Sequence, residues 1–66
     1  MSWPQATRDA EQWLDRLQLK RPAIGQTLDL RPFANRLPFT GRYRDMVINA
    51  IRRIMKRRRI DVTLPK

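Results

Sequence analysis

Apolar residues recur at helical spacing in two long stretches of the chain. In the first stretch they fall on one arc of a helical wheel, while the charged residues face away. The members of this arc are Trp3, Ala6, Ala10, Trp13, Leu14 and Leu17. Ser2 can cap the amino terminus with Pro4 in the first turn, and Pro22 disfavours helical backbone in the residue before it. We therefore expect a helix over residues 3–20 with both tryptophans in its buried face.

The second long stretch predicts a helix over residues 41–58, with Thr40 as its cap. Its apolar stripe consists of Tyr43, Met46, Val47, Ala50, Ile51 and Ile54 and is widened by Ile48 and Met55. Such a stripe covers more than half of the helical wheel and is wider than one short partner helix can bury. We therefore expect Ile48, Ile51 and Met55 to lie at an interface with a second subunit or another partner.

A short helix is predicted between these two. Leu30, Phe33, Ala34 and Leu37 repeat at helical spacing over residues 30–37. Asp29 can cap this helix and Pro38 ends it. An extended segment over residues 27–33 is the alternative.

The carboxyl-terminal residues predict a strand over residues 60–64, because apolar and polar residues alternate there. A single strand cannot satisfy its own backbone hydrogen bonds. It must pair with the segment 24–30, with its copy in a dimer, or with a partner protein. Its apolar residues Ile60, Val62 and Leu64 therefore join the expected interface.

Together these elements predict one mainly α domain over residues 1–66, a small bundle of two long helices and one short helix with a short carboxyl-terminal strand. With 66 residues, such a domain buries only about 60% of the surface that its unfolded chain exposes. Ordering the chain costs on the order of 100 kcal/mol, at roughly 1.5 kcal/mol per residue. Because self-association adds stability to so small a core, we expect a homodimer.

The chain contains no cysteine and no histidine. Thiol chemistry, disulfides and the commonest metal ligands are therefore excluded. The six carboxylates are scattered, with no pair at a spacing typical of acid and base partners. We expect no enzyme activity, no cofactor and no metal. The chain also lacks an apolar run of membrane length and a signal-peptide pattern, which predicts a cytoplasmic protein without integral membrane association.

The net charge of +9 is concentrated in one half of the chain. Residues 1–33 carry five basic and four acidic residues, whereas residues 34–66 carry ten basic and two acidic residues. Twelve of the fifteen basic residues are arginines, whose planar guanidinium fits phosphates and guanine edges. This asymmetry predicts a surface for a polyanion, and composition alone leaves DNA, RNA, an anionic membrane and an acidic protein open.

The segment from Leu30 to Val47 resembles the helix-turn-helix motif of DNA-binding proteins. It offers a small residue where two helices would cross, apolar residues at the core positions and a short turn, and it departs from the usual pattern at Pro38 and Arg44. The resemblance implies that residues 41–58 form the recognition helix, with Thr40, Arg42 and Arg44 nearest base edges or phosphates.

The same resemblance implies two further groups of contacts. Asn49 is of the residue type that reads adenine. The remaining basic side chains would clamp backbone phosphates, and they are Arg52, Arg53, Lys56, Arg57, Arg58 and Arg59. The resulting hypothesis is a small DNA-binding regulator, for example one from a phage or mobile element, that binds double-stranded DNA. The alternative is a small adaptor or inhibitor, for example one from a phage, that binds a host protein through its apolar helix face or strand edge. An acidic protein is a further possible partner of the basic surface.

Overall fold

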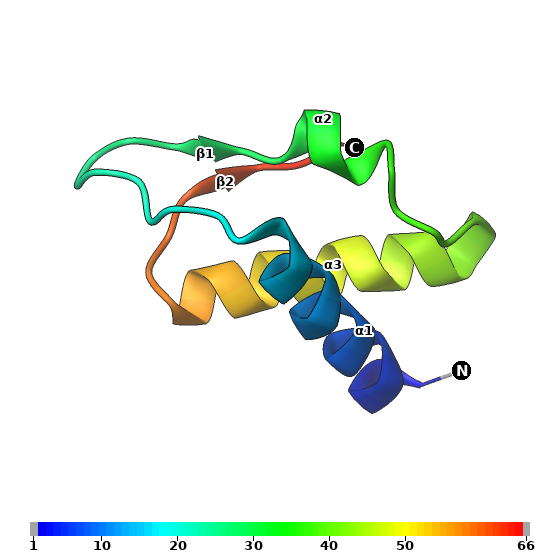
Figure 1. Ribbon diagram of the computed structural model, residues 1–66. Helices are drawn as coiled ribbons and strands as arrows, with labels where there is room; N and C mark the ends of the chain where they lie inside the picture. The colour runs from blue at the N-terminus through cyan, green and yellow to red at the C-terminus, as the bar shows by residue number, and fades with distance from the viewer. Residues whose placement is uncertain (1, 66) are drawn as a thin grey trace.

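Two long amphipathic helices form where the apolar spacing predicts them. In the computed structural model, which describes residues 2–65, they are α1 (Trp3–Leu17) and α3 (Gly41–Arg57), and they cross each other (Figure 1). The Ser2 hydroxyl accepts a hydrogen bond from the Gln5 N–H at 3.4 Å, as expected of a cap. The mainly α fold with two long helices and one short helix is therefore confirmed.

Helix α1 is shorter than the predicted 3–20. Gln18 adopts left-handed backbone, with φ 49°, and its N–H bonds to the carbonyl of Asp15 at 3.3 Å. This left-handed residue ends the helix about one turn before Pro22, which was expected to end it. Gln18 is therefore the cap of α1, and residues 19–20 belong to the connection that leads to β1.

The contact between α1 and α3 is the main interface of the fold. Three alanines, Ala6 and Ala10 on α1 and Ala50 on α3, are completely buried or nearly so. Side chains that end at Cβ allow helix axes to approach closely, and larger side chains then fill the space on either side. Val47 and Ile51 of α3 are completely buried in this core.

The carboxyl-terminal strand pairs within the chain. Strands β1 (Leu28–Asp29) and β2 (Val62–Thr63) are parallel, with Leu28 opposite Val62 and Asp29 opposite Thr63. Of the three pairing partners that the pattern left open, the segment 24–30 is therefore confirmed. Parallel strands need a crossover connection, which α2 and α3 supply (Figure 1). Strand β2 is shorter than the expected strand over residues 60–64.

Helix α2 (Arg31–Ala34) is a single turn and not the predicted helix over 30–37. Leu30 occupies the cap position, whereas Asp29 belongs to β1, so the extended alternative is correct for the start of this segment. The Asp29 carboxylate accepts the Arg31 backbone N–H and two side-chain N–H groups, each at 3.0 Å. These hydrogen bonds from Arg31 lower the pKa of Asp29 and raise the pKa of Arg31.

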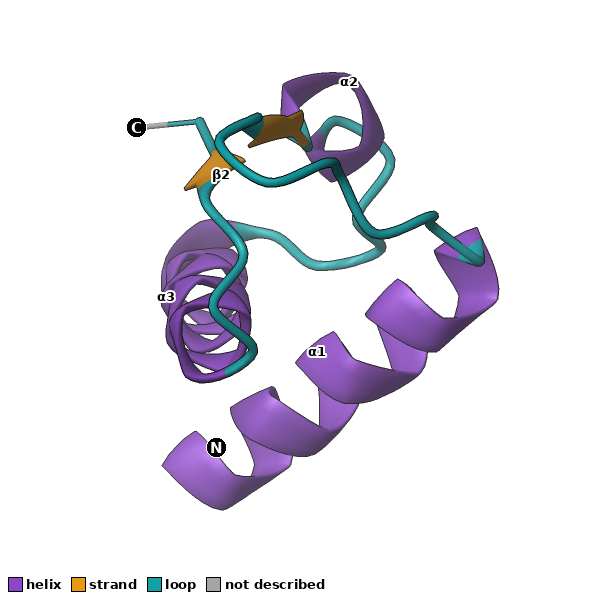
Figure 2. Ribbon diagram, turned by 90° about the vertical axis from the view of Figure 1, so that its left-hand side faces the viewer, coloured by secondary structure: helices purple, strands orange, loops and turns teal. Residues whose placement is uncertain are grey.

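One chain is sufficient to cover the wide apolar stripe of α3. Ile48, Ile51 and Met55 are at most 5% exposed. Seen along α3, helix α1 covers one side, and the β1–β2 pair with α2 covers another (Figure 2). This burial corrects the expectation that a second subunit covers these three residues. Ile60, Val62 and Leu64 are half-buried against the same core, and the homodimer stays a prediction.

The two tryptophans differ, although both lie on the apolar arc of α1. Trp13 is 8% exposed and belongs to the core, as predicted. Trp3 is 43% exposed, which corrects the expectation that it is buried. It stands in the first turn of α1, and the guanidinium carbon of Arg53 lies 5.0 Å from its ring centroid.

Among residues 2–65 no helix is both long enough and apolar enough to span a bilayer.

A polar contact supplements the apolar packing of α1 on α3. The Tyr43 hydroxyl donates a hydrogen bond to the Asp9 carboxylate, and the Tyr43 ring packs edge-on against Phe39 at 5.2 Å. The hydrogen bond to Asp9, together with burial and the negative charge of Asp9, raises the pKa of Tyr43 to about 12. Because folding favours the protonated phenol, this contribution to stability is complete below pH 10 and is lost as the pH rises through about 12.

We predict that Tyr43 ionises near pH 12 in the folded protein. Tyr43 is the only tyrosine of the chain, so the tyrosinate absorbance at alkaline pH reports on this residue alone. Replacing Asp9 by asparagine removes the negative charge and should move the midpoint back toward 10, the ordinary value for tyrosine. A midpoint near 10 in the unaltered, folded protein would contradict the contact with Asp9.

Candidate nucleic-acid interface

The solvent-facing side of α3 is mainly cationic, with four of its five cations in the carboxyl-terminal part of the helix. We define the α3 basic face as the exposed basic residues Arg42, Arg52, Arg53, Lys56 and Arg57. They share one arc of the helix because the apolar residues occupy the rest of its circumference. At 1.5 Å per residue, the face is about 22 Å long. Asn49 and Asp45 are the exposed polar residues that interrupt it.

These cations lack carboxylate partners. Within residues 2–65 the one side-chain ion pair is Arg31–Asp29, which lies outside α3. Asp45 is the one carboxylate on the α3 basic face and forms no ion pair there, so the five cations outweigh it and add up to a positive potential along the helix. A surface that served solubility alone would intersperse both signs of charge.

Two arginines of this face are held by neighbours that leave their charge exposed. Arg52 Nη1 donates a hydrogen bond to Asn49 Oδ1 at 2.8 Å, and the Arg53 guanidinium stacks on Trp3. Stacking and hydrogen bonding of this kind restrict a long side chain before a ligand arrives. This hydrogen bond occupies the side-chain oxygen of Asn49, the residue that the resemblance to helix-turn-helix proteins assigns to an adenine contact.

Helix α3 ends in a hydrogen-bonded cap that contains an arginine where glycine is usual. Arg59 has φ 60°. Its N–H bonds to the Lys56 carbonyl at 3.1 Å, and the Ile60 N–H bonds to the Met55 carbonyl at 2.9 Å. This pair of bonds is the Schellman motif, in which the left-handed position favours glycine because a Cβ is strained there. Arg59 therefore adopts a strained backbone in this cap.

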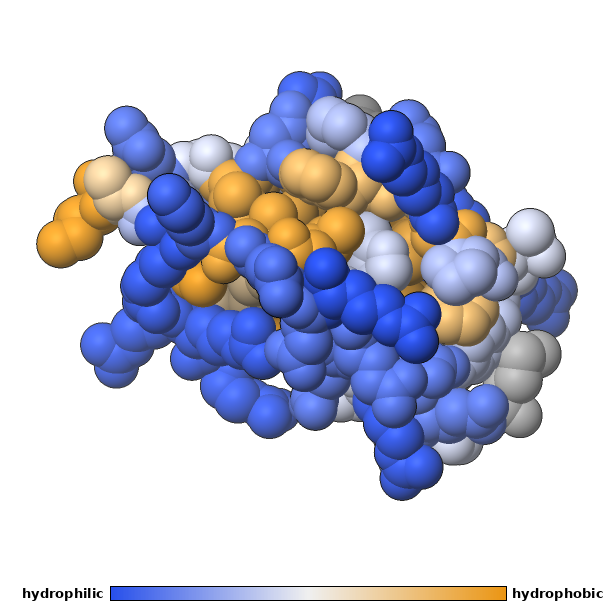
Figure 3. All heavy atoms as spheres, viewed as in Figure 1, coloured by the Kyte–Doolittle hydropathy of each residue, from blue (hydrophilic) through white to orange (hydrophobic). Residues whose placement is uncertain are grey.

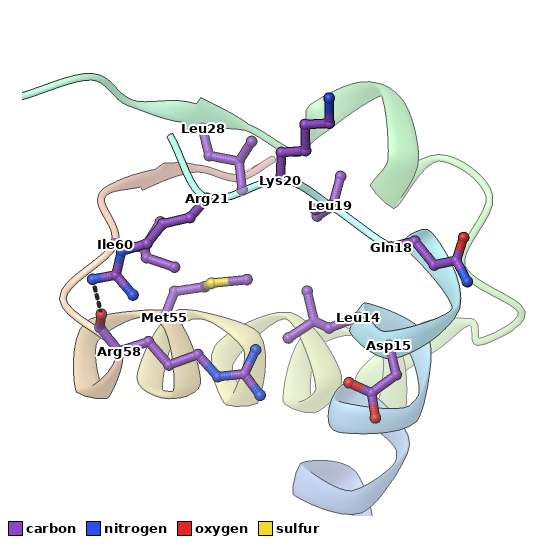
Figure 4. A pocket seen from close by; sticks show the side chains of 10 residues that line it. All are labelled: Leu14, Asp15, Gln18, Leu19, Lys20, Arg21, Leu28, Met55, Arg58 and Ile60. Carbon is purple, nitrogen blue, oxygen red and sulfur yellow. Dashed lines mark hydrogen bonds between the residues drawn. The ribbon is translucent and has the colours of Figure 1, made fainter. Parts of the chain in front are cut away.

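The amino-terminal half contributes two more cations to the end of α3. Arg21 Nη2 donates a hydrogen bond to the carbonyl of Arg58 at 2.9 Å, which ties the segment after α1 to the end of α3 (Figure 4). Lys20 lines the same hollow as Arg21 and Arg58. We call Lys20, Arg21, Arg58 and Arg59 the basic corner. Lys20 and Arg21 were missed by the sequence prediction because their half of the chain is nearly neutral.

The basic corner borders an apolar hollow. Leu14, Leu28, Met55 and Ile60 contribute its apolar side chains, and its volume is about 320 Å³ (Figure 4). On the surface, this apolar patch is ringed by hydrophilic residues, which also cover the region around the carboxyl end of α3 (Figure 3). The hollow places Ile60 and Met55 beside the cap of α3, where an apolar contact commonly accompanies a Schellman motif.

Two predicted contact residues lie apart from this surface. Arg44 is half-buried and shares the side of α3 that carries Ile51 and Met55, away from the α3 basic face. This position corrects its grouping with the other basic residues. Thr40 is exposed at the amino-terminal end of α3, and its side chain makes no capping hydrogen bond to the described part of the chain. The other eight predicted residues lie on the exposed arc of α3 or at its carboxyl end.

Comparisons with models of protein families, with curated proteins and with solved structures found no match. The resemblance to helix-turn-helix proteins therefore stays a prediction. The chemistry of this chain's own surface is the basis for inferring its function.

Proposed function

We propose that this protein binds double-stranded DNA through the α3 basic face and the basic corner. The observation that carries the proposal is the gathering of nine exposed cations on one helix and its carboxyl end, without a carboxylate at ion-pair distance among residues 2–65. Bringing like charges together opposes folding unless an anion neutralises them. A polyphosphate backbone supplies such neutralisation and releases its own condensed counterions on binding.

Geometry supports a duplex as the ligand. The α3 basic face is about 22 Å long, which corresponds to roughly six base pairs at about 3.4 Å per pair. An α-helix fits the major groove of a duplex, where arginine side chains reach both phosphates and base edges. Because the cations outnumber the residues suited to reading bases, contacts to phosphates dominate in this proposal, and they carry little sequence information.

A regulatory role would follow if the amino-terminal part of α3 also read base edges. In the arrangement that a helix-turn-helix implies, Thr40 and Arg42 are the candidate readers. Helix α2 has a single turn, and residues 35–40 separate it from α3. This connection is longer than the three or four residues typical of the motif. The proposal therefore rests on the charge of α3 and does not depend on the motif.

The alternative function, an adaptor, loses one of its two expected surfaces, the apolar face of α3, whereas binding through a strand edge stays a prediction. Ile48, Ile51 and Met55 are buried within the chain, so they offer little area to another protein. An acidic protein partner would have to meet the same cations as DNA does. Salt dependence separates the two ligands, because release of condensed counterions is a property of nucleic acids.

We predict that replacing Arg52, Arg53 and Lys56 by alanine weakens binding to any duplex. If the nine cations of the α3 basic face and the basic corner each neutralise one phosphate, log K falls with log salt concentration with a slope of about −8. With six of the nine left, the slope should be about −5. Fluorescence anisotropy with a labelled duplex at several salt concentrations measures both slopes.

The matched control replaces Arg8, Arg16 and Arg36 by alanine. These arginines are exposed and lie outside the α3 basic face, so the variant has the same net charge as the first one. This control variant should retain most of the salt slope of the unaltered protein. Equal slopes in the two variants would show that net charge alone, and not this face, attracts DNA. If the unaltered protein binds no nucleic acid at low salt, the proposed function is wrong.

We predict opposite effects of Arg59→Gly on stability and on binding. Glycine relieves the left-handed backbone and should raise the free energy of unfolding by about 1 kcal/mol. Loss of the cation should lower the salt slope by about 0.9.

Gln18→Gly is the control, because Gln18 is also left-handed but lies at the end of α1. It should stabilise the fold and leave binding unchanged. Thermal unfolding and anisotropy measure the two effects, and unchanged DNA binding by Arg59→Gly would remove Arg59 from the interface.

A further inference from the structure

Ile24 is the most exposed large apolar side chain among the described residues. Its relative exposure is 105%, so its side chain is as accessible as in an extended peptide. Trp3 is the other exposed large apolar residue, and Arg53 stacks on it. Ile24 thus takes no part in the apolar core, although a chain of this size gains stability from each apolar side chain that it buries.

A defined turn holds Ile24 at the tip of the connection between α1 and β1. The Gln26 N–H donates a hydrogen bond to the Ala23 carbonyl at 3.0 Å, which closes a four-residue turn. Gly25 has φ 83°, a conformation that the third position of such a turn requires in type II geometry and that glycine adopts without strain. Ile24 occupies the second position, where its side chain points outward. The exposed side chain therefore stands on an ordered turn.

This tip lies beside the basic corner. Ile24 lines a hollow of about 130 Å³ together with Arg21 and Arg59, and Asp61 is the one carboxylate among the residues around it. Arg21 is in turn bonded to the carbonyl of Arg58, so the connection is anchored at the end of α3. Figure 1 shows this connection projecting past the same end of the molecule at which α3 terminates. An apolar tip with cations beside it matches a ligand that presents apolar surface between anionic groups.

We propose that Ile24 is a wedge that enters the base stack of the bound duplex and bends it. This inference rests on the proposed function, because the α3 basic face must first hold the phosphate backbone. Aliphatic side chains that insert between base pairs from the minor groove unstack one step and kink the duplex. Cations beside such a wedge can neutralise the phosphates that flank the kink. Arg21 and Arg59 are placed for that second role. A bilayer fits less well, because interfacial binding requires a broad apolar face and Ile24 is a single side chain.

The wedge has a consequence for DNA preference. Unstacking opposes insertion least where stacking is already weak or absent, as at TA and CA steps or beside an unpaired nucleotide. The protein should therefore bind a duplex with a one-nucleotide bulge several-fold more tightly than the fully paired duplex. Ile24→Ser should abolish this preference while retaining the affinity that phosphate contacts supply.

The decisive measurement is the bend itself. A duplex of about 30 base pairs, far below the persistence length of about 150 base pairs, carries a donor and an acceptor dye at its ends. Energy transfer should rise when the unaltered protein binds and should stay at the level of free DNA with Ile24→Ser. Ile24→Leu should restore bending. Gln26→Ser is the matched control, because Gln26 is exposed in the same turn and its turn hydrogen bond comes from the backbone. Circular dichroism should show that all three variants fold, since Ile24 packs against nothing.

Different outcomes separate the wedge from the proposed function. Salt-dependent binding without bending, and with equal affinities of Ile24→Ser and unaltered protein for the bulged duplex, would overturn the wedge and leave DNA binding intact. Absence of binding to any nucleic acid would overturn both. In a parallel arm with phosphatidylglycerol and phosphatidylcholine vesicles, binding that Ile24→Ser loses, together with an unbent duplex, would identify Ile24 as a membrane contact and overturn the wedge.

Discussion

The structure depends on the burial of α3 from two directions. Helix α1 packs against it through alanines that permit a close approach, and the β1–β2 pair with α2 covers a second side. These contacts account for an apolar stripe that covers more than half of the helix. What remains for solvent is a narrow arc, whose side chains are cationic except for Asp45 and Asn49. The packing of the core thus also determines the shape of the charged surface.

The carboxyl end of α3 links the fold to the candidate interface. The Schellman cap turns the chain at Arg59 and leads it through Ile60 into β2, which pairs with β1. Strand β1 in turn follows the connection that carries Arg21 and Ile24. Because Arg21 also bonds to the carbonyl of Arg58, one small region sets the end of the helix, the basic corner and the position of the exposed tip.

Elements with strong local signals were predictable. The amino-terminal cap at Ser2 and the whole of α3 follow from residue types and spacing, because a long amphipathic stripe specifies a helix irrespective of its partner. The segment around Asp29 was ambiguous because helical and extended patterns overlap in it. Its conformation was decided by β2, which offers the backbone of Leu28 and Leu30 hydrogen-bond partners at 2.8 and 3.0 Å from far along the chain.

By itself, the sequence determined the helical class, the amphipathic faces of α1 and α3, and the concentration of charge in the second half. Periodicity and composition are local properties, so they need no knowledge of neighbours. Only the tertiary structure decided that Trp13 is buried and Trp3 exposed on the same arc, and that Ile48 is covered by its own chain. It also decided that Lys20 and Arg21 join the cations of α3. The reason is that burial and proximity depend on where helices cross and where distant segments meet, and the spacing of residues within one element does not contain that information.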